Sequence, residues 1–243
     1  KQLVELMTKY NIKLSAGKPY QRLTEMLMAS NSCNLLSIET FSTEEQNLIH
    51  STALKAYIPH LRLQWYFWNN DTEQALATIP EAEQTRPLML SSIAVVEHDF
   101  LKGLILAQQF RQAPAALQKT YLTDIQQIIE SFGRLAVHCK TNFEHKYLLL
   151  SAELACIENL SFKRIITLYQ QAIQSAKENG FLQYQALANE LVARFLMDYP
   201  LSGSTNTYLK EAYQLYGLWG CVVKLKTFEE EFPELFASTA ELR

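Results

Sequence analysis

The stretch FEHKYLLLSAELACIENLSFKRIITLYQQAIQSAKENGFLQYQALANELVARFLMDY, residues 143–199, decides the fold of this chain. Two short polar segments, ENLS at 158–161 and NG at 179–180, divide it into three longer segments. In each longer segment apolar residues recur at three- and four-residue spacing, which indicates amphipathic helices. The pattern predicts a helix from Phe143, a tight turn at 158–161, a second helix, a break at 179–180 and a third helix beginning at Phe181.

The composition of the whole chain agrees with this helical pattern. The 243 residues are 48% hydrophobic, which is ample apolar material for a large core. Glycine and proline number only seven each, too few for the many turns of a multi-stranded β fold. The sequence therefore predicts an all-α fold.

Helical periodicity continues on both sides of the central stretch. A capping box at Ser42 and Thr43 starts a long helix that Pro59 should bend, and Pro80 and Pro87 should bracket the end of the helix after it. Asn142 should cap the helix that opens the central stretch. The expected helices outside that stretch cover residues 1–14, 20–28, 43–68, 72–83, 88–110, 115–139, 208–216 and the segment through Phe232.

A recurring triplet of positions gives the helices a repeat. Ile165, Tyr169 and Ala172 occupy the small, aromatic, small positions in the second helix of a tetratricopeptide repeat, a helix-turn-helix unit. Paired helices of this kind bury their shared face only by stacking on further pairs. Two more degenerate copies of the triplet are Ala75, Ile79 and Ala82, and Thr205, Leu209 and Ala212.

These repeats predict a tetratricopeptide-like right-handed superhelix, a solenoid of about five helical hairpins. We expect residues 43–243 to form it as one continuous domain with C-terminal capping helices. Residues 1–42 should add N-terminal helices that pack on the solenoid. The chain opens on Lys1 rather than Met and ends on Arg243 within a continuing helical pattern, so we expect a piece of a longer protein.

The central stretch resembles the tetratricopeptide-like region of large bacterial multidomain signalling ATPases and kinases. In those proteins a kinase-like or STAND-type nucleotide-binding module precedes the helical repeats, and a GAF and histidine-kinase module often follows. The resemblance covers residues 142–220 best and 43–110 more weakly. Its segments are FEHKY at 143–147, AELA at 152–155, LYQQAI at 168–173, AKENG at 176–180, ALANE at 186–190 and the stretch 208–220 that ends in LWG.

The resemblance implies a regulatory module and carries no enzyme activity over to this chain. The nucleotide-binding and kinase motifs of such proteins are absent from its 243 residues. Gly17-Lys18 is no phosphate loop, because Ile12 stands where that motif needs its first glycine and Pro19 stands where it needs Ser or Thr. No nucleophile–base arrangement is evident, so we expect no catalysis.

Charge, cysteines and hydropathy limit the partners further. A formal net charge of −3 supplies no field that would attract nucleic acid or anionic lipid. The four cysteines form no CxxC pair, which fits a reducing cytoplasm. No apolar run is long enough for a membrane span and no signal peptide opens the chain. We expect a cytoplasmic protein that binds neither nucleic acid nor membrane.

Metal and cofactor sites are not expected. His138, Cys139 and His145 lie close in sequence, but a predicted helix break separates them and no fourth ligand has suitable spacing. His50 and His60 lie ten apart on a predicted helix and do not share a face. We therefore expect no metal and no cofactor.

The candidate binding residues are Lys146, Tyr147, Glu190 and Arg194, which are embedded in the repeat pattern. Glu190 and Arg194 stand four apart, so a helical ion pair is the simpler role and partner contact the alternative. These residues suggest a non-catalytic module that docks a peptide or neighbouring domain of a signalling protein. The second hypothesis is a small-molecule sensor with an inter-helix pocket built from Trp65, Trp68, Tyr121 or Tyr147. The oligomeric state stays open.

Overall fold

The computed structural model describes residues 25, 28, 43, 56–89, 93–199 and 203–240, with side chains up to 236. Within these residues every regular element is a helix and no strand occurs, which confirms the all-α prediction. The chain divides into two compact units, Lys1–His98 and Asp99–Arg243. The predicted boundary at residue 42 and the predicted helices at 1–14 and 20–28 lie outside the described residues, apart from Glu25 and Met28.

The described helices of unit 1 form an antiparallel pair followed by a short connection. The helix α4 (Tyr57–Trp68) turns into α5 (Thr72–Thr85), a 3₁₀ helix η4 (Arg86–Met89) follows, and α6 (Ile93–Gln109) begins in unit 1 and continues into unit 2. Asn70 adopts a left-handed φ of 57° in the turn. The Asp71 side chain then accepts from the backbone N–H of Gln74, which caps α5.

Both prolines of these helices lie within regular structure. Pro59 is in the first turn of α4, where its missing N–H would have no helical partner in any case. The predicted end of α5 between Pro80 and Pro87 is confirmed, since α5 includes Pro80 and ends at Thr85. The helix predicted from Thr43 to Trp68 differs in extent, because α4 begins at Tyr57. Thr43 is helical, and residues 44–55 lie outside the described residues, as do residues 90–92 near the predicted start of α6.

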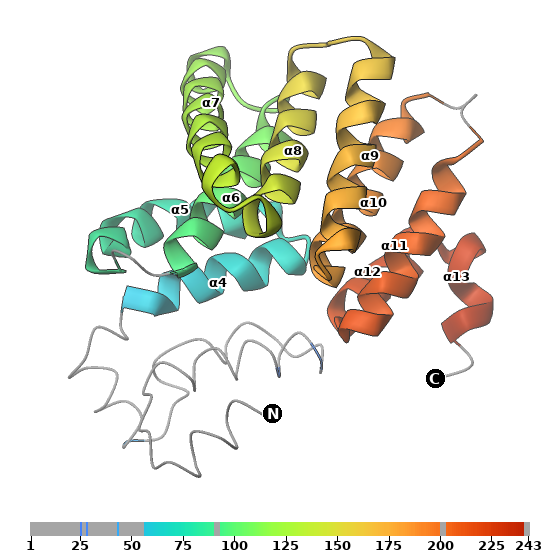
Figure 1. Cartoon of the computed structure of the whole chain (residues 1–243). Helices are drawn as coiled ribbons and strands as arrows, with labels where there is room; N and C mark the ends of the chain where they lie inside the picture. The colour runs from blue at the N-terminus through green and yellow to red at the C-terminus, as the bar shows by residue number, and fades with distance from the viewer. Residues whose placement is uncertain are drawn as a thin grey trace. The chain divides into compact units, whose positions relative to one another are not determined.

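Unit 2 is a run of helices in which, from α7 on, each one packs on the next along the chain (Figure 1). It contains most of α6 and then α7 (Ala115–His138), α8 (Lys140–Ile157), α9 (Phe162–Glu178), α10 (Leu182–Met197), α11 (Thr205–Trp219), α12 (Val222–Glu231) and α13 (Pro233–Ala240).

The turns predicted in the central stretch are confirmed. Between α8 and α9 Asn159 takes a left-handed φ of 52°, and Ser161 caps α9 by accepting from the backbone N–H of Arg164. Gly180 has a φ of 74° between α9 and α10, a conformation that glycine adopts without a steric penalty. The prediction that Asn142 caps α8 is wrong, because extended Cys139 separates α7 from α8 and α8 already begins at Lys140.

The helix α10 is buried around its whole circumference, and its small residues let neighbours approach closely. It packs against α8, α9 and α11. Surface helices normally bury one stripe, so a helix buried on all sides belongs to the interior of its unit. Its buried residues are Tyr184, Gln185, Ala186, Leu187, Ala188, Asn189, Glu190, Leu191, Val192, Ala193 and Leu196.

The predicted repeat positions are buried in all three helices. Ile165, Tyr169 and Ala172 on α9 are each at most 2% exposed. The copies on α5 and α11 are also buried at Ala75, Ile79, Ala82, Leu209 and Ala212, and Thr205 is half-buried. The triplets therefore mark helix contacts. None of the helices in the described part is long and apolar enough to cross a bilayer.

Enlarging a repeat position should destabilise unit 2. Ala172→Leu adds three carbons at a 1% exposed contact on α9, and such overpacking costs about 1–3 kcal/mol of unfolding free energy. Ala116→Leu makes the same change on the exposed face of α7 and should stay within about 0.5 kcal/mol. Urea denaturation followed by circular dichroism measures both. Equal midpoints for the two variants would contradict close packing at Ala172.

Candidate functional site

The helix α7 leaves much of its apolar surface uncovered. Of its 24 residues only Ile125 and Phe132 are buried, and Val137 is 82% exposed. Its inner face packs through Phe132 on Phe100 of α6, with ring centroids 6.0 Å apart. The outer face carries apolar residues outside that stripe. An exposed apolar surface of this kind is a mark of an interaction site when it is contiguous.

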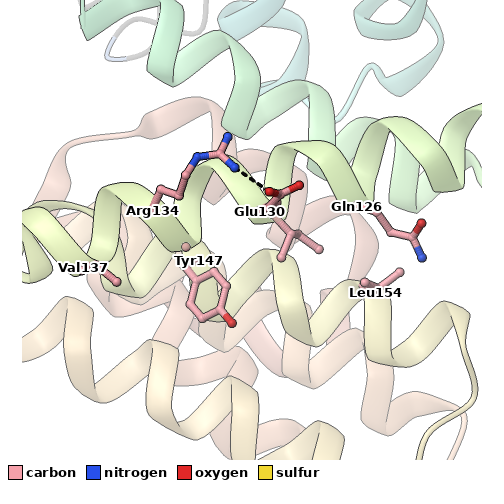
Figure 2. A pocket seen from close by; sticks show the side chains of 8 residues that line it. Gln126, Glu130, Arg134, Val137, Tyr147 and Leu154 are labelled. Atoms are coloured by element: carbon pink, nitrogen blue, oxygen red, sulfur yellow. Dashed lines mark hydrogen bonds and ion pairs between the residues drawn. The ribbon is translucent and has the colours of Figure 1, made fainter.

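An open groove runs between α7 and α8, with a volume of about 450 Å³. Figure 2 shows polar residues of α7 along one side and the two contributors from α8 on the other. The α7 residues recur at three- and four-residue spacing, so they form a single face over about three turns. The lining residues are Gln126, Ile129, Glu130, Gly133, Arg134 and Val137 of α7, and Tyr147 and Leu154 of α8.

The floor of the groove is the ring of Tyr147, which lies over Gly133. A Cβ placed on Gly133 would be 3.4 Å from Cε2 of Tyr147, tighter than ordinary van der Waals contact. The glycine therefore lets the tyrosine ring approach the backbone of α7. Tyr147 and Leu154 are seven residues apart and so lie on the same side of α8.

One exposed ion pair forms the polar rim. Nη1 of Arg134 donates to Oε1 of Glu130 at 2.7 Å, with side-chain exposures of 63% and 74% (Figure 2). An exposed pair at this spacing contributes only about 0.3–0.5 kcal/mol to stability. Either charge can therefore turn to another partner at little cost. The lining contains no histidine, cysteine or serine.

The structure separates the four predicted binding residues. Tyr147 lies in the groove, but its neighbour Lys146 points to the interior and is 4% exposed. The Lys146 ammonium lies 4.4 Å from the ring centroid of Tyr184 and 5.1 Å from that of Phe100. Such cation–π contacts stabilise a desolvated ammonium. Lys146 therefore braces α8 against α10 and α6.

Glu190 and Arg194 belong to a network that joins α10 to α11 and α12, buried at Glu190 and partly exposed at Arg194. Both carboxylate oxygens of Glu190 accept from Nζ of Lys224 on α12, at 2.9 and 3.1 Å. The hydroxyl of Tyr216 on α11 donates to the same carboxylate at 2.7 Å. Arg194 donates to Glu190 at 3.1 Å and reaches Glu231 on α12 at 2.6 and 2.7 Å. The predicted helical ion pair is present, within a larger network.

This network holds Glu190 in its charged form. Burial alone would raise the pKa of Glu190, but the charges of Lys224 and Arg194 and the hydroxyl of Tyr216 outweigh it. Together they lower the pKa from its usual 4.5 to about 2. The carboxylate is therefore a charged brace between α10, α11 and α12.

Glu153 on α8 is also buried, but its pKa is raised rather than lowered. Its carboxylate accepts one hydrogen bond, from the hydroxyl of Tyr169 on α9 at 2.6 Å. Burial raises the pKa of Glu153 from 4.5 to about 7, opposed by the Tyr169 hydrogen bond and by the charge of Arg111. Cys156 lies 3.6 Å from the same hydroxyl. Near neutral pH this carboxyl is therefore partly protonated.

In unit 1 the rings of His60 and His98 meet edge to face, with centroids 4.8 Å apart, and two further histidines lie in unit 2. In unit 2, His138 is exposed at the end of α7, and His145 is buried between the rings of Phe181 and Tyr184 at 4.5 and 5.0 Å. Burial, and then the charge of Lys146, lower the pKa of His145 to about 3. In unit 1, Trp65 and Trp68 are core residues. No group of three His, Cys, Asp or Glu among the described residues could hold a metal ion.

Sequence reasoning named Tyr147, which the structure places in the lining of this groove, and missed its neighbours from α7. The missed residues are Glu130, Gly133, Arg134 and Val137. A glycine in the middle of a strongly helical pattern was the available signal, since it usually marks a close approach. The second available signal was the exposed Val137, an apolar residue outside the buried stripe of α7.

Comparison with known proteins gives one partial match. Over 60 residues the chain is 38% identical to the hybrid signal transduction histidine kinase G of Dictyostelium discoideum. That segment is 25% of this chain and 2% of the length of that protein. No family model matches the chain. No solved structure matches it either.

Removing the charge of Glu190 should destabilise unit 2 strongly. Glu190→Gln removes the carboxylate charge that pairs with buried Lys224 at 2.9 Å, and breaking such a pair costs about 3–5 kcal/mol of unfolding free energy. Glu211→Gln on the exposed face of α11 is the control and should change stability by less than about 0.5 kcal/mol. Urea denaturation at pH 7 measures both variants. A loss below about 1 kcal/mol for Glu190→Gln would contradict a bracing role.

Neutralising Glu153 should stabilise the protein, in a pH-dependent way. The folded state holds the Glu153 proton more tightly than the unfolded state, so this group costs stability as the pH rises from 4.5 through 7. Glu153→Gln keeps an acceptor for Tyr169 without the charge. At pH 8 the variant should gain about 1–3 kcal/mol over the unmodified chain, and at pH 4.5 the gain should vanish. A difference that does not change between pH 4.5 and 8 would contradict the raised pKa.

Proposed function

We propose that this chain is a non-catalytic protein-docking module of a cytoplasmic signalling protein, built as a tetratricopeptide-like stack of helical pairs. The buried triplets on α5, α9 and α11, joined by short turns, support the repeat. In such stacks each pair contacts mainly its neighbours, and the surfaces left open bind partners. The resemblance of residues 142–220 to signalling proteins and the partial match to a signal transduction histidine kinase support the setting.

The groove between α7 and α8 carries the proposal. It is open to solvent and extends along about three turns of α7. Its floor is apolar at Ile129, Tyr147 and Leu154, and its rim is the Glu130–Arg134 pair. An apolar floor with a polar rim matches the way an amphipathic helix lies in a groove, with its own apolar residues at i, i+3, i+4 and i+7.

A docking module of this kind regulates by preferring one state of its partner. Binding in the groove shifts the partner from one state to the other only to the extent that the groove's affinity for the two states differs. The buried Lys146 holds α8, one wall of the groove, against the rings of Tyr184 and Phe100, so binding needs little reorganisation. Preorganisation of that sort lowers the entropic cost of association.

A small-molecule sensor is the second candidate. The observation in its favour is the groove volume of about 450 Å³, which lies in the range of ligand pockets, with Tyr147 in its lining. A thermal-shift screen against metabolites separates the two candidates, because a ligand that binds only the folded state raises Tm. A hit that Gly133→Leu abolishes, by filling the groove beside Tyr147, would favour the sensor.

Site-specific photocrosslinking in cells tests the docking function. A photoreactive benzoylphenylalanine in place of Val137, at the groove, should yield discrete crosslinked protein bands. The same residue in place of exposed Thr120, near the other end of α7, is the matched control and should yield few. Mass spectrometry of the bands identifies the partner. No protein adduct above the Thr120 background would overturn the assignment of a docking surface to this groove.

A further inference from the structure

The rim of the groove has a charge order that fits its own copy. Along α7 the exposed face reads Gln126, Glu130, Gly133, Arg134 and Val137. If two such helices lie antiparallel about a twofold axis, Glu130 of each faces Arg134 of the other. The acidic and basic positions lie at equal distances on either side of that axis. An isologous interface requires this self-complementarity of a surface patch.

We infer that the groove binds α7 of a second copy of this chain, in an antiparallel twofold dimer. The inference rests on the proposed function, because it names the partner of the same docking surface. Each chain would supply one groove and one inserted helix. The exposed Val137 of one chain would lie near Gln126 of the other, over the end of the groove, and would lose its contact with water.

Gly133 lies between the two members of the charged pair, next to the twofold axis of this arrangement. Its absent Cβ would point at its own chain, where the ring of Tyr147 lies with Cε2 3.4 Å from that position. At the centre of the face the helix of the second copy would therefore meet the backbone of α7 and the ring of Tyr147.

The ion pair would change partners on association. Within one chain Glu130 and Arg134 are 2.7 Å apart and largely exposed, so their pairing contributes little. Across the dimer each charge would gain a second opposite charge while part of its water is removed, and Coulomb attraction strengthens as the dielectric falls. This exchange would favour the antiparallel orientation over the parallel one, which places like charges together.

The available surface sets the expected affinity. The helix α7 has 24 residues and is about 36 Å long. One helix lying in one groove, repeated by symmetry, gives an area at the low end of stable interfaces, about 1,200 Å² in total. We therefore expect dissociation in the micromolar range rather than an obligate dimer.

Charge reversal on the 243-residue chain tests this arrangement. Sedimentation equilibrium should show concentration-dependent dimers for the unmodified chain. Glu130→Arg and Arg134→Glu each place like charges across the twofold axis, so each variant should weaken self-association by at least about tenfold. An equimolar mixture of these two variants should recover dimers, since one chain is then basic and the other acidic at both positions. The double variant Glu130→Arg with Arg134→Glu restores complementarity and should also dimerise.

The outcomes separate this inference from the proposed function. A chain that stays monomeric to about 500 μM, well above the micromolar dissociation expected for a small interface, overturns the dimer. Dimers that persist unchanged in both single variants overturn it as well, because another surface then makes them. In either case crosslinks from Val137 to a different protein would leave the docking function standing. Thermal denaturation confirms that each variant is folded, and Val137→Glu provides a second variant that should weaken the dimer.

Discussion

The arrangement of unit 2 depends on the hydrogen-bonded network around the buried carboxylate of Glu190. This carboxylate lies in α10, the helix that is covered on all sides, where an unpaired charge would be very costly. Lys224 of α12, Tyr216 of α11 and Arg194 offset this cost by pairing with the carboxylate, and Arg194 also donates to Glu231. These bonds have fixed directions. Hydrophobic contacts alone would tolerate small rotations of the helices, and this network does not.

The same helices hold a second buried carboxyl with the opposite character. Glu153 receives a single hydroxyl, from Tyr169, and no cation within ion-pair distance among the described residues. Its pKa therefore rises to about 7, and that of Glu190 falls to about 2. The pKa values of these two buried carboxyl groups thus differ because of their partners alone. The Glu190 network supports α10, α11 and α12. The groove lies away from it, on the face of α8 that carries Tyr147 and Leu154.

The helices themselves were predictable from the sequence, and the errors have local causes. The turns at 158–161 and 179–180 were found because their polar residues and glycine interrupt a regular period. The predicted end of α5 between Pro80 and Pro87 was right, since α5 ends at Thr85. Asn142 misled because it is a good cap in principle, but α8 already begins at Lys140, after the extended Cys139.

By itself the sequence determined that the described part of the chain is helical, where its central turns fall and which triplets lie at helix contacts. These follow from spacing along the chain, which periodicity reports directly. Only the tertiary structure decided the fate of the charged and aromatic candidates. Lys146 and Tyr147 are adjacent, yet one braces the core and the other lies in a groove. Glu190 meets Lys224 only because α12 returns to α10, and the groove exists only because Gly133 faces Tyr147 across two helices. Such contacts join residues distant in sequence, and no local pattern encodes them.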